Sequence, residues 1–188
     1  INMSPALYDS FALIYDLQHR TYLDDVPMYV QLARQHASQS AILELGAGSG
    51  RVMVTLVEAG FRVTGVDESA EMLRLAEDRL KQSPHAPADH WSLIQADARA
   101  FQSDARYNIL HNATREDQLG TLASARRHLH AGGVVIVDLP PNDELTYQPD
   151  DGEFQHEATM VDPENNAQLN KYVASRIFWA TQEQELTY

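Results

Sequence analysis

Three carboxylates and a cluster of glycines are the groups in this 188-residue chain best suited to bind a ligand. Glu44, Asp67 and Asp97 each stand near the end of a short apolar run, in ILELGAGSG, VTGVDES and LIQADA. Three glycines follow Glu44 closely. Residues without Cβ let a ligand approach the backbone, and carboxylates accept hydrogen bonds from hydroxyl and amino groups. The pattern predicts a site for a nucleoside-containing ligand at the glycine turn.

The spacing of the glycines separates two possible ligands. Gly46, Gly48 and Gly50 follow G-x-G-x-G, whereas the dinucleotide fingerprint is G-x-G-x-x-G. Glu44 beside the turn would repel a pyrophosphate and favour a ligand with cationic groups. S-adenosylmethionine, whose net charge is about +1, suits that turn. A ribose-binding role for Asp67 fits either ligand, so an NAD(P)-type oxidoreductase stays as the alternative.

Strands and helices that alternate along the chain would position these groups. Apolar runs predict strands at 41–45, 62–66, 92–96, 107–110 and 134–139. Apolar stripes at helical spacing lie between most of them: Val52, Leu56 and Val57; Met72, Leu73, Ala76 and Leu80; Leu119, Leu122, Ala125 and Leu129. This order is typical of an α/β, doubly wound and mainly parallel sheet, with ligands at the carboxyl ends of the strands.

Other local signals complete this organisation. A further helix is expected from Asp24 to Ala37, a capping box at Thr114–Asp117, and a helix end at Gly132–Gly133. After two prolines a polar loop is expected to lead to two antiparallel strands, 168–180 and 183–188. The chain then reads as one domain, with N-terminal lid helices in 1–38, a cofactor-binding core in 39–140 and a small β insert in 141–188.

Four segments together resemble a known family. ILELGAGSGRV, VTGVDESAEML, LIQADARAF and HLHAGGVVIVDL are similar, in order and spacing, to motifs of class I S-adenosylmethionine-dependent methyltransferases. The resemblance runs from about Tyr8 to Leu139. It implies a Rossmann-like methyltransferase fold and transfer of a methyl group to a nitrogen or oxygen of a small metabolite, with S-adenosylhomocysteine as product. A non-catalytic relative that binds the cofactor stays as a second alternative.

The resemblance also implies which residues contact the cofactor. Glu44 and the backbone of Gly46, Ala47 and Gly48 would hold the methionine end. Asp67, followed by Glu68, would bind the ribose.

The adenine is assigned to three further residues by the same resemblance. Met72 would pack near the ring, and Asp97 with the amide of Ala98 would bind the edge of the base.

Two aromatic residues and a histidine are the candidates for the reacting end. YDSFALIYD is similar to a Y-D-x-x-A-x-x-Y-D pattern of small-molecule methyltransferases. Tyr8 and Tyr15 are seven residues apart and share a helical face. By analogy Tyr15 would cover the reactive methyl, although it would equally suit packing of a lid helix. His111, after the fourth strand, is a candidate acceptor contact, with a plain surface role as the alternative.

Composition limits the partners. Asp and Glu outnumber Lys and Arg by 27 to 14, giving a net charge of −13, which disfavours nucleic acids and anionic membranes. The chain has no cysteine, no apolar stretch long enough to span a bilayer, and eight scattered histidines without metal-ligand spacing. The expectation is a cytoplasmic protein without metal that takes a small-molecule methyl acceptor; a homodimer stays open.

The chain departs from the family pattern in two places. Leu110 leads directly into HNAT, where relatives have several more residues, so a mobile segment is expected to be missing there. The two closing strands of the fold are also missing. We therefore expect the native protein to be longer, or a partner to cover the open sheet edge.

Overall fold

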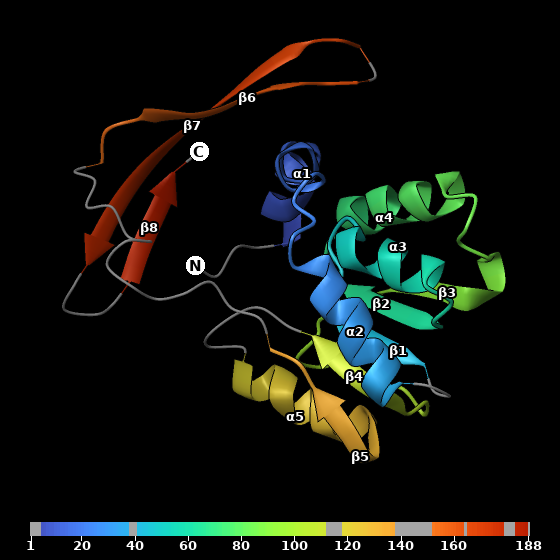
Figure 1. The fold of residues 1–188 in the computed structure, drawn as a ribbon. Helices are drawn as coiled ribbons and strands as arrows, with labels where there is room; N and C mark the ends of the chain where they lie inside the picture. Colours follow the sequence, from blue (N-terminus) through green and yellow to red (C-terminus); the bar gives the residue numbers. More distant parts are fainter. Residues whose placement is uncertain are drawn as a thin grey trace.

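The computed structural model describes residues 5–37, 41–111, 118–137, 152–163, 165–178 and 183–187. Its centre is a five-stranded parallel sheet in the order β3-β2-β1-β4-β5. The strands are β1 (Ile42–Leu45), β2 (Val63–Asp67), β3 (Trp91–Gln95), β4 (Tyr107–His111) and β5 (Leu129–Val135). The helices are α1 (Pro5–His19), α2 (Val26–His36), α3 (Arg51–Glu58), α4 (Ala70–Gln82), a short 3₁₀ turn at Ala88–His90 and α5 (Gln118–His128). The predicted α/β architecture is confirmed (Figure 1).

Helices cover both faces of the sheet, and β1 shows this most clearly. Its four residues are all buried. Successive side chains of a strand point to opposite faces. Ile42 packs in a cluster with α2, α3 and α4, while Leu43 and Leu45 pack in a second cluster that includes Ala125 of α5. Burial on both faces explains why three of the four residues of this strand are apolar, with Glu44 as the exception.

Helices α3 and α4 bury the stripes that the sequence predicts. Val52, Leu56 and Val57 of α3 are buried, as are the four predicted residues of α4. The side chain of Ser69 caps α4 by accepting a hydrogen bond from the backbone N–H of Met72, at 3.1 Å. Both helices therefore follow from apolar periodicity, and α4 also from a capping residue.

The prediction for α5 is wrong at two of its apolar positions. Leu119 is 80% and Leu122 40% exposed, and the buried face instead carries Thr121, Ser124 and His128 beside Ala125. These polar groups find partners in the preceding segment: Ser124 Oγ donates to the carbonyl of Phe101 at 3.3 Å, and the N–H of Ser103 donates to Nε2 of His128 at 3.0 Å. Hydrogen bonding lets a polar face be buried.

The fifth strand also differs from the prediction. It begins at Leu129, directly after α5, so Gly132 and Gly133 lie within a strand instead of ending a helix. The pairing register of β4 with β5 shifts between Tyr107 and Ile109. Gly132 has a φ of +81°, a conformation that glycine adopts without strain and that suits such an irregularity.

A separate antiparallel sheet follows, with strands β6 (Gln155–Val161), β7 (Gln168–Phe178) and β8 (Glu183–Thr187). The two predicted strands are confirmed. β6 falls in the segment expected to be a polar loop. Most of its residues are exposed, so its sequence lacks the apolar alternation that would predict a strand. The predicted capping box at 114–117 lies outside the described residues.

Helix α1 connects the two sheets. It lies between α4 and the antiparallel sheet, as Figure 1 shows at the top of the molecule. Across the described ranges, no helix has both the length and the apolar character needed to cross a membrane.

Candidate functional site

The glycine turn between β1 and α3 is the centre of the candidate site. The N–H groups of Gly46 and Ala47 both donate to the carbonyl of Val66, at 2.8 and 3.0 Å, which ties the turn to β2. A Cβ at Gly50 would lie 2.9 Å from the Cβ of Ala76, so this glycine is needed for packing. A Cβ at Gly48, where φ is +54°, would meet nothing within 4 Å. Gly48 therefore leaves open space at the backbone.

Glu44 belongs to β1 and precedes the first glycine of the turn by two residues. Its side chain is 4% exposed, and its Oε2 has no hydrogen-bond partner among the described residues. Burial raises the pKa of Glu44 from 4.5 to about 8, while the nearby charge of Arg51 opposes the shift and that of Asp67 adds to it. The group is therefore mostly protonated at neutral pH and would ionise if a cation came near.

Asp67 ends β2 and faces the turn. Its Oδ2 accepts the N–H of Gly48 at 2.8 Å, and its Oδ1 accepts the N–H of Ser69 at 2.9 Å. Burial raises the pKa of Asp67, and these backbone hydrogen bonds oppose the shift. Each carboxylate oxygen has two lone pairs, so this carboxylate keeps capacity for ligand hydroxyls.

Arg51 is a charged residue of the site whose role sequence reasoning missed. It is the first residue of α3 and makes a two-pronged ion pair with Asp25, at 2.5 and 2.7 Å. It also donates to the carbonyl of Tyr22 at 2.7 Å and lies over that ring. Its position directly after the glycines was the available signal. The pair joins the glycine turn to the segment that leads into α2.

The predicted lid residues lie on α1. The ring of Tyr15 stacks on His19 with centroids 4.1 Å apart and meets Phe11 edge-on at 5.9 Å. Burial raises the pKa of the Tyr15 hydroxyl, on which the charges of Arg51 and Asp67 also act. The structure therefore brings Tyr15 near the turn. The backbone of Tyr8 lies on the same helix; its side chain lies outside what the structure describes.

His111 ends β4, and its backbone pairs with that of Glu44 across the sheet. Its side chain lies outside what the structure describes, so its assigned role stays a prediction.

The residues assigned to the adenine, and Glu68 beside Asp67, differ in their exposure and in the partners that hold them. Asp97 lies beyond the end of β3 and is held by Arg99, with Nη2 donating to Oδ2 at 2.6 Å, which lowers the pKa of the carboxyl. Ala98 follows it. Met72 is 2% exposed, packed within α4, whereas Glu68 is exposed. The carboxylate of Asp67 is therefore bound to the glycine turn and to the start of α4, whereas that of Asp97 is paired with the nearby Arg99.

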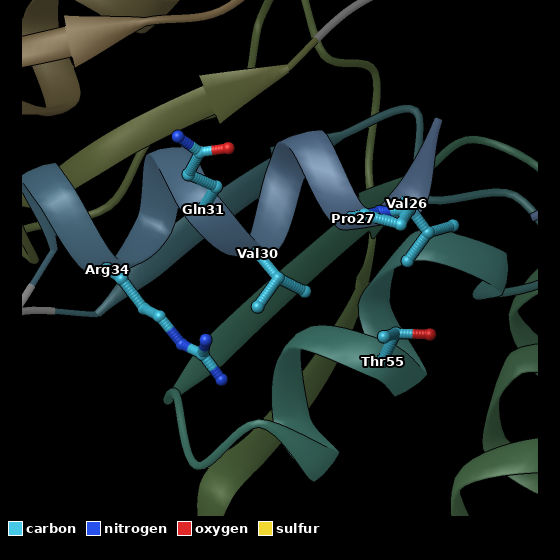
Figure 2. Close-up of a pocket in the computed structure, with 6 residues that line it drawn as sticks. All are labelled: Val26, Pro27, Val30, Gln31, Arg34 and Thr55. Atoms are coloured by element: carbon cyan, nitrogen blue, oxygen red, sulfur yellow. The ribbon is translucent and has the colours of Figure 1, made fainter. Parts of the chain in front are cut away.

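A hollow of about 560 Å³ lies between α2 and α3 (Figure 2). Its described lining comprises Val26, Pro27, Val30, Gln31, Arg34 and Thr55. This lining includes none of the predicted site residues, and its one guanidinium is that of Arg34 on α2. The hollow is therefore distinct from the candidate site.

The chemistry open to the site follows from these groups. A buried carboxyl at the strand end before an open turn, together with the carboxylate of Asp67, can bind a cationic ligand that carries vicinal hydroxyls. Within the described residues, no cluster of three or more histidine, aspartate or glutamate side chains could hold a metal ion.

Part of this chain is similar in sequence to known methyltransferases. Residues 42–133 match the family model described as a methyltransferase domain. The trans-aconitate 2-methyltransferase of Azoarcus sp. (strain BH72) is 37% identical over 118 residues, which cover 59% of this chain and 44% of that protein. The putative methyltransferase YqeM of Bacillus subtilis (strain 168) is 27% identical over 71% of this chain and 55% of its own length.

Solved structures share the fold. The glycopeptide N-methyltransferase MtfA, complexed with S-adenosylhomocysteine, has a TM-score of 0.58 and 21% identity over 87% of this chain and 73% of its own. The chain spans about half the length of the curated relatives it matches. The match to the methyltransferase-domain model runs from the start of β1 into β5, and this part of the chain holds the glycine turn.

Proposed function

We propose that this protein is an S-adenosylmethionine-dependent methyltransferase acting on a nitrogen or oxygen of a small metabolite. The domain match over residues 42–133 and the names of the relatives support the reaction class. The neighbour solved with S-adenosylhomocysteine supports the cofactor. The relatives' names differ in their acceptors, so the acceptor is proposed only as a small molecule.

One observation carries the proposal: Glu44, at the end of β1, is a buried carboxyl whose Oε2 has no partner among the described residues, and the turn that follows is open at Gly48. The negative charge of a pyrophosphate bound at this turn would oppose the ionisation of Glu44. A ligand with an ammonium and a sulfonium would instead favour the ionised form. This favours S-adenosylmethionine over NAD(P) at the same fold.

The remaining contacts follow from the strand ends. Asp67, which already accepts two backbone N–H groups, would accept the ribose hydroxyls at its free lone pairs. Glu68 stands beside it. Asp97 would contact the adenine edge with the amide of Ala98 while it stays paired with Arg99. Met72 would support the ring from within α4.

The chemical demands on the protein are modest. The sulfonium supplies the leaving group, because its bond to the methyl carbon breaks as the acceptor's lone pair forms the new bond. The protein therefore has to align the acceptor and exclude water. Tyr15 would cover the reacting end, and His111 would contact the acceptor. An acceptor hydroxyl would need a base to take its proton, whereas a neutral amine attacks first and loses its proton later.

Calorimetry tests the cofactor assignment. S-adenosylhomocysteine should bind and NAD⁺ should not. At pH 7 binding should release about one proton, because the ligand's ammonium lowers the pKa of Glu44. Titrations in buffers of different ionisation enthalpy measure this release. Glu44→Gln should abolish it. Glu77→Gln, at a half-buried α4 residue paired with Lys81, is the control and should leave it unchanged.

Turnover needs a second measurement. Labelled S-adenosylmethionine and a panel of small amines and carboxylates should yield a labelled product. Cofactor binding without any product across a broad panel would favour the non-catalytic alternative. Binding of NAD⁺ in preference to S-adenosylhomocysteine would overturn the proposal.

A further inference from the structure

Helix α1 is docked on α4 by two aspartates that the ligand assignments do not use. Asp9 and Asp16 are seven residues apart, and Ala12, which is 2% exposed, lies between them. At this spacing all three share one helical face. Asp16 is paired with Arg79 of α4. The small side chain of Ala12 lets the two helices approach closely.

Asp9 reaches the N-terminus of α4. Its Oδ1 accepts the hydroxyl of Ser69 at 2.6 Å and the N–H of Glu71 at 3.2 Å. These hydrogen bonds, that of the Ser69 hydroxyl first, lower the pKa of Asp9. Both donors meet the same oxygen, so an amide oxygen in its place could accept both.

Ser69 extends this contact to the proposed cofactor site. Its N–H donates to Oδ1 of Asp67, whose Oδ2 accepts the N–H of Gly48. A continuous chain of hydrogen bonds thus runs from α1 through Asp9, Ser69 and Asp67 to the glycine turn. Ser69 is 1% exposed, so water does not compete for its contacts.

The opposite side of α1 is also held. Nζ of Lys171 on β7 donates to Oε1 of Gln18 at 2.9 Å and is paired with Glu157 of β6 at 2.6 Å. Helix α1 therefore lies between α4 and the antiparallel sheet (Figure 1). It carries Tyr15, which is close enough to Arg51 and Asp67 for their charges to act on its hydroxyl. A change in how α1 docks would move the ring of Tyr15 and the partner of Ser69 together.

We propose that Asp9 is a positioning residue that couples docking of α1 to ligand binding at Asp67. The proposal rests on the cofactor site proposed above. Asp9 holds Ser69, Ser69 orients one oxygen of Asp67, and the other oxygen holds the glycine turn. A ligand that binds Asp67 therefore stabilises the docked α1, and by linkage the docked α1 tightens the ligand.

Three variants test this coupling. Asp9→Ala removes the acceptor, and Asp9→Asn keeps an oxygen at the same place. Glu71→Ala is the matched control, because it removes one negative charge at the same helix end and leaves the backbone N–H that donates to Asp9. Calorimetry measures the affinity for S-adenosylhomocysteine, and hydrogen exchange measures protection of α1 with and without that ligand.

The expected pattern is specific. Asp9→Ala should bind about tenfold more weakly, and the ligand should no longer protect its α1. Asp9→Asn should stay within about twofold of the wild type and keep that protection, as should Glu71→Ala. If Asp9→Ala does not fold, Asp9→Ser, too short to reach both donors, replaces it with the same expectation.

Two results would overturn the coupling. The first is wild-type affinity in Asp9→Ala with α1 exchanging faster, which would make Asp9 an anchor of α1 and nothing more. The second is an equal loss in Asp9→Asn and Asp9→Ala, which would exclude the hydrogen-bond chain. If the wild type itself does not bind S-adenosylhomocysteine, the proposed function fails with it, and this result is distinct from both.

Discussion

The parallel sheet has two sides, one made of β1, β2 and β3 and the other of β4 and β5, and they differ in how helices pack against them. Beside β1, β2 and β3, helices α3 and α4 bury apolar stripes, and the strands pair without a shift in register. Beside β4 and β5, helix α5 buries polar residues and exposes Leu119. The pairing register of β4 with β5 also shifts. The glycine turn, Glu44 and Asp67 all lie on the first side. The candidate site therefore lies on the side where the residues predicted to be buried are buried. Regular strand pairing and apolar packing hold the backbone of the site in place there.

The largest expected effect contrasts two glycines, one from each side. Gly50 and Gly132 both have positive φ, but a Cβ at Gly50 would strike Ala76, whereas one at Gly132 meets nothing within 4 Å. Gly50→Val should lower the free energy of unfolding by about 3–5 kcal/mol, from overpacking together with backbone strain. Gly132→Val should lose about 1–2 kcal/mol, from strain alone. Urea denaturation of both variants measures the difference. Equal losses would show that the turn is not packed against α4 in solution.

The second effect concerns the buried carboxyl on the β1 side. Between pH 4.5 and 8 the folded protein keeps a proton on Glu44 that the unfolded chain has released. The wild type should therefore lose stability as the pH rises through that window, whereas Glu44→Gln has no such loss. From pH 5 to pH 8 the variant should gain about 2–4 kcal/mol relative to the wild type, at about 1.4 kcal/mol per pKa unit. A pH-independent difference would mean that Glu44 is ionised in the folded protein.

This contrast also explains how far the sequence predicts the structure. The strands around the turn and the buried faces of α3 and α4 follow from apolar period and from the cap at Ser69. The face of α5 does not, because His128 and Ser124 are buried by hydrogen bonds to residues 101–103, which no periodicity encodes. Exposed strands such as β6 are missed for another reason: their pattern contains little apolar alternation.

The candidate site divides in the same way. Glu44, Gly48 and Asp67 are recognisable because each stands at or just after the end of an apolar strand, and the structure brings them together. The partners that hold them in place were not recognisable. Asp25 lies 26 residues from Arg51, and Asp9 lies 60 residues from Ser69. Such pairs arise from tertiary packing, so a single sequence does not reveal them.

The third prediction compares ligand binding on the two sides. Asp67→Ala should weaken the binding of S-adenosylhomocysteine by about 1–3 kcal/mol, because two polar contacts to the ribose are lost. Asp104→Ala, in the exposed segment before β4, removes the same charge and should leave the affinity unchanged. Calorimetry at one pH and one salt concentration compares them. Equal affinity of Asp67→Ala and the wild type would place the ribose elsewhere.

The smallest effect tests the exposed face of α5. Leu119→Ala should change the free energy of unfolding by less than about 0.5 kcal/mol, because the side chain is 80% exposed. Leu80→Ala, the same change at a fully buried position of α4, should cost about 2–5 kcal/mol. Denaturant unfolding at two protein concentrations measures both. If Leu119→Ala costs more than about 1 kcal/mol, and more so at the higher concentration, then α5 is covered by another molecule in solution. The two sides of the sheet would then differ in what covers them, and the apolar stripe of α5 would serve an interface between chains.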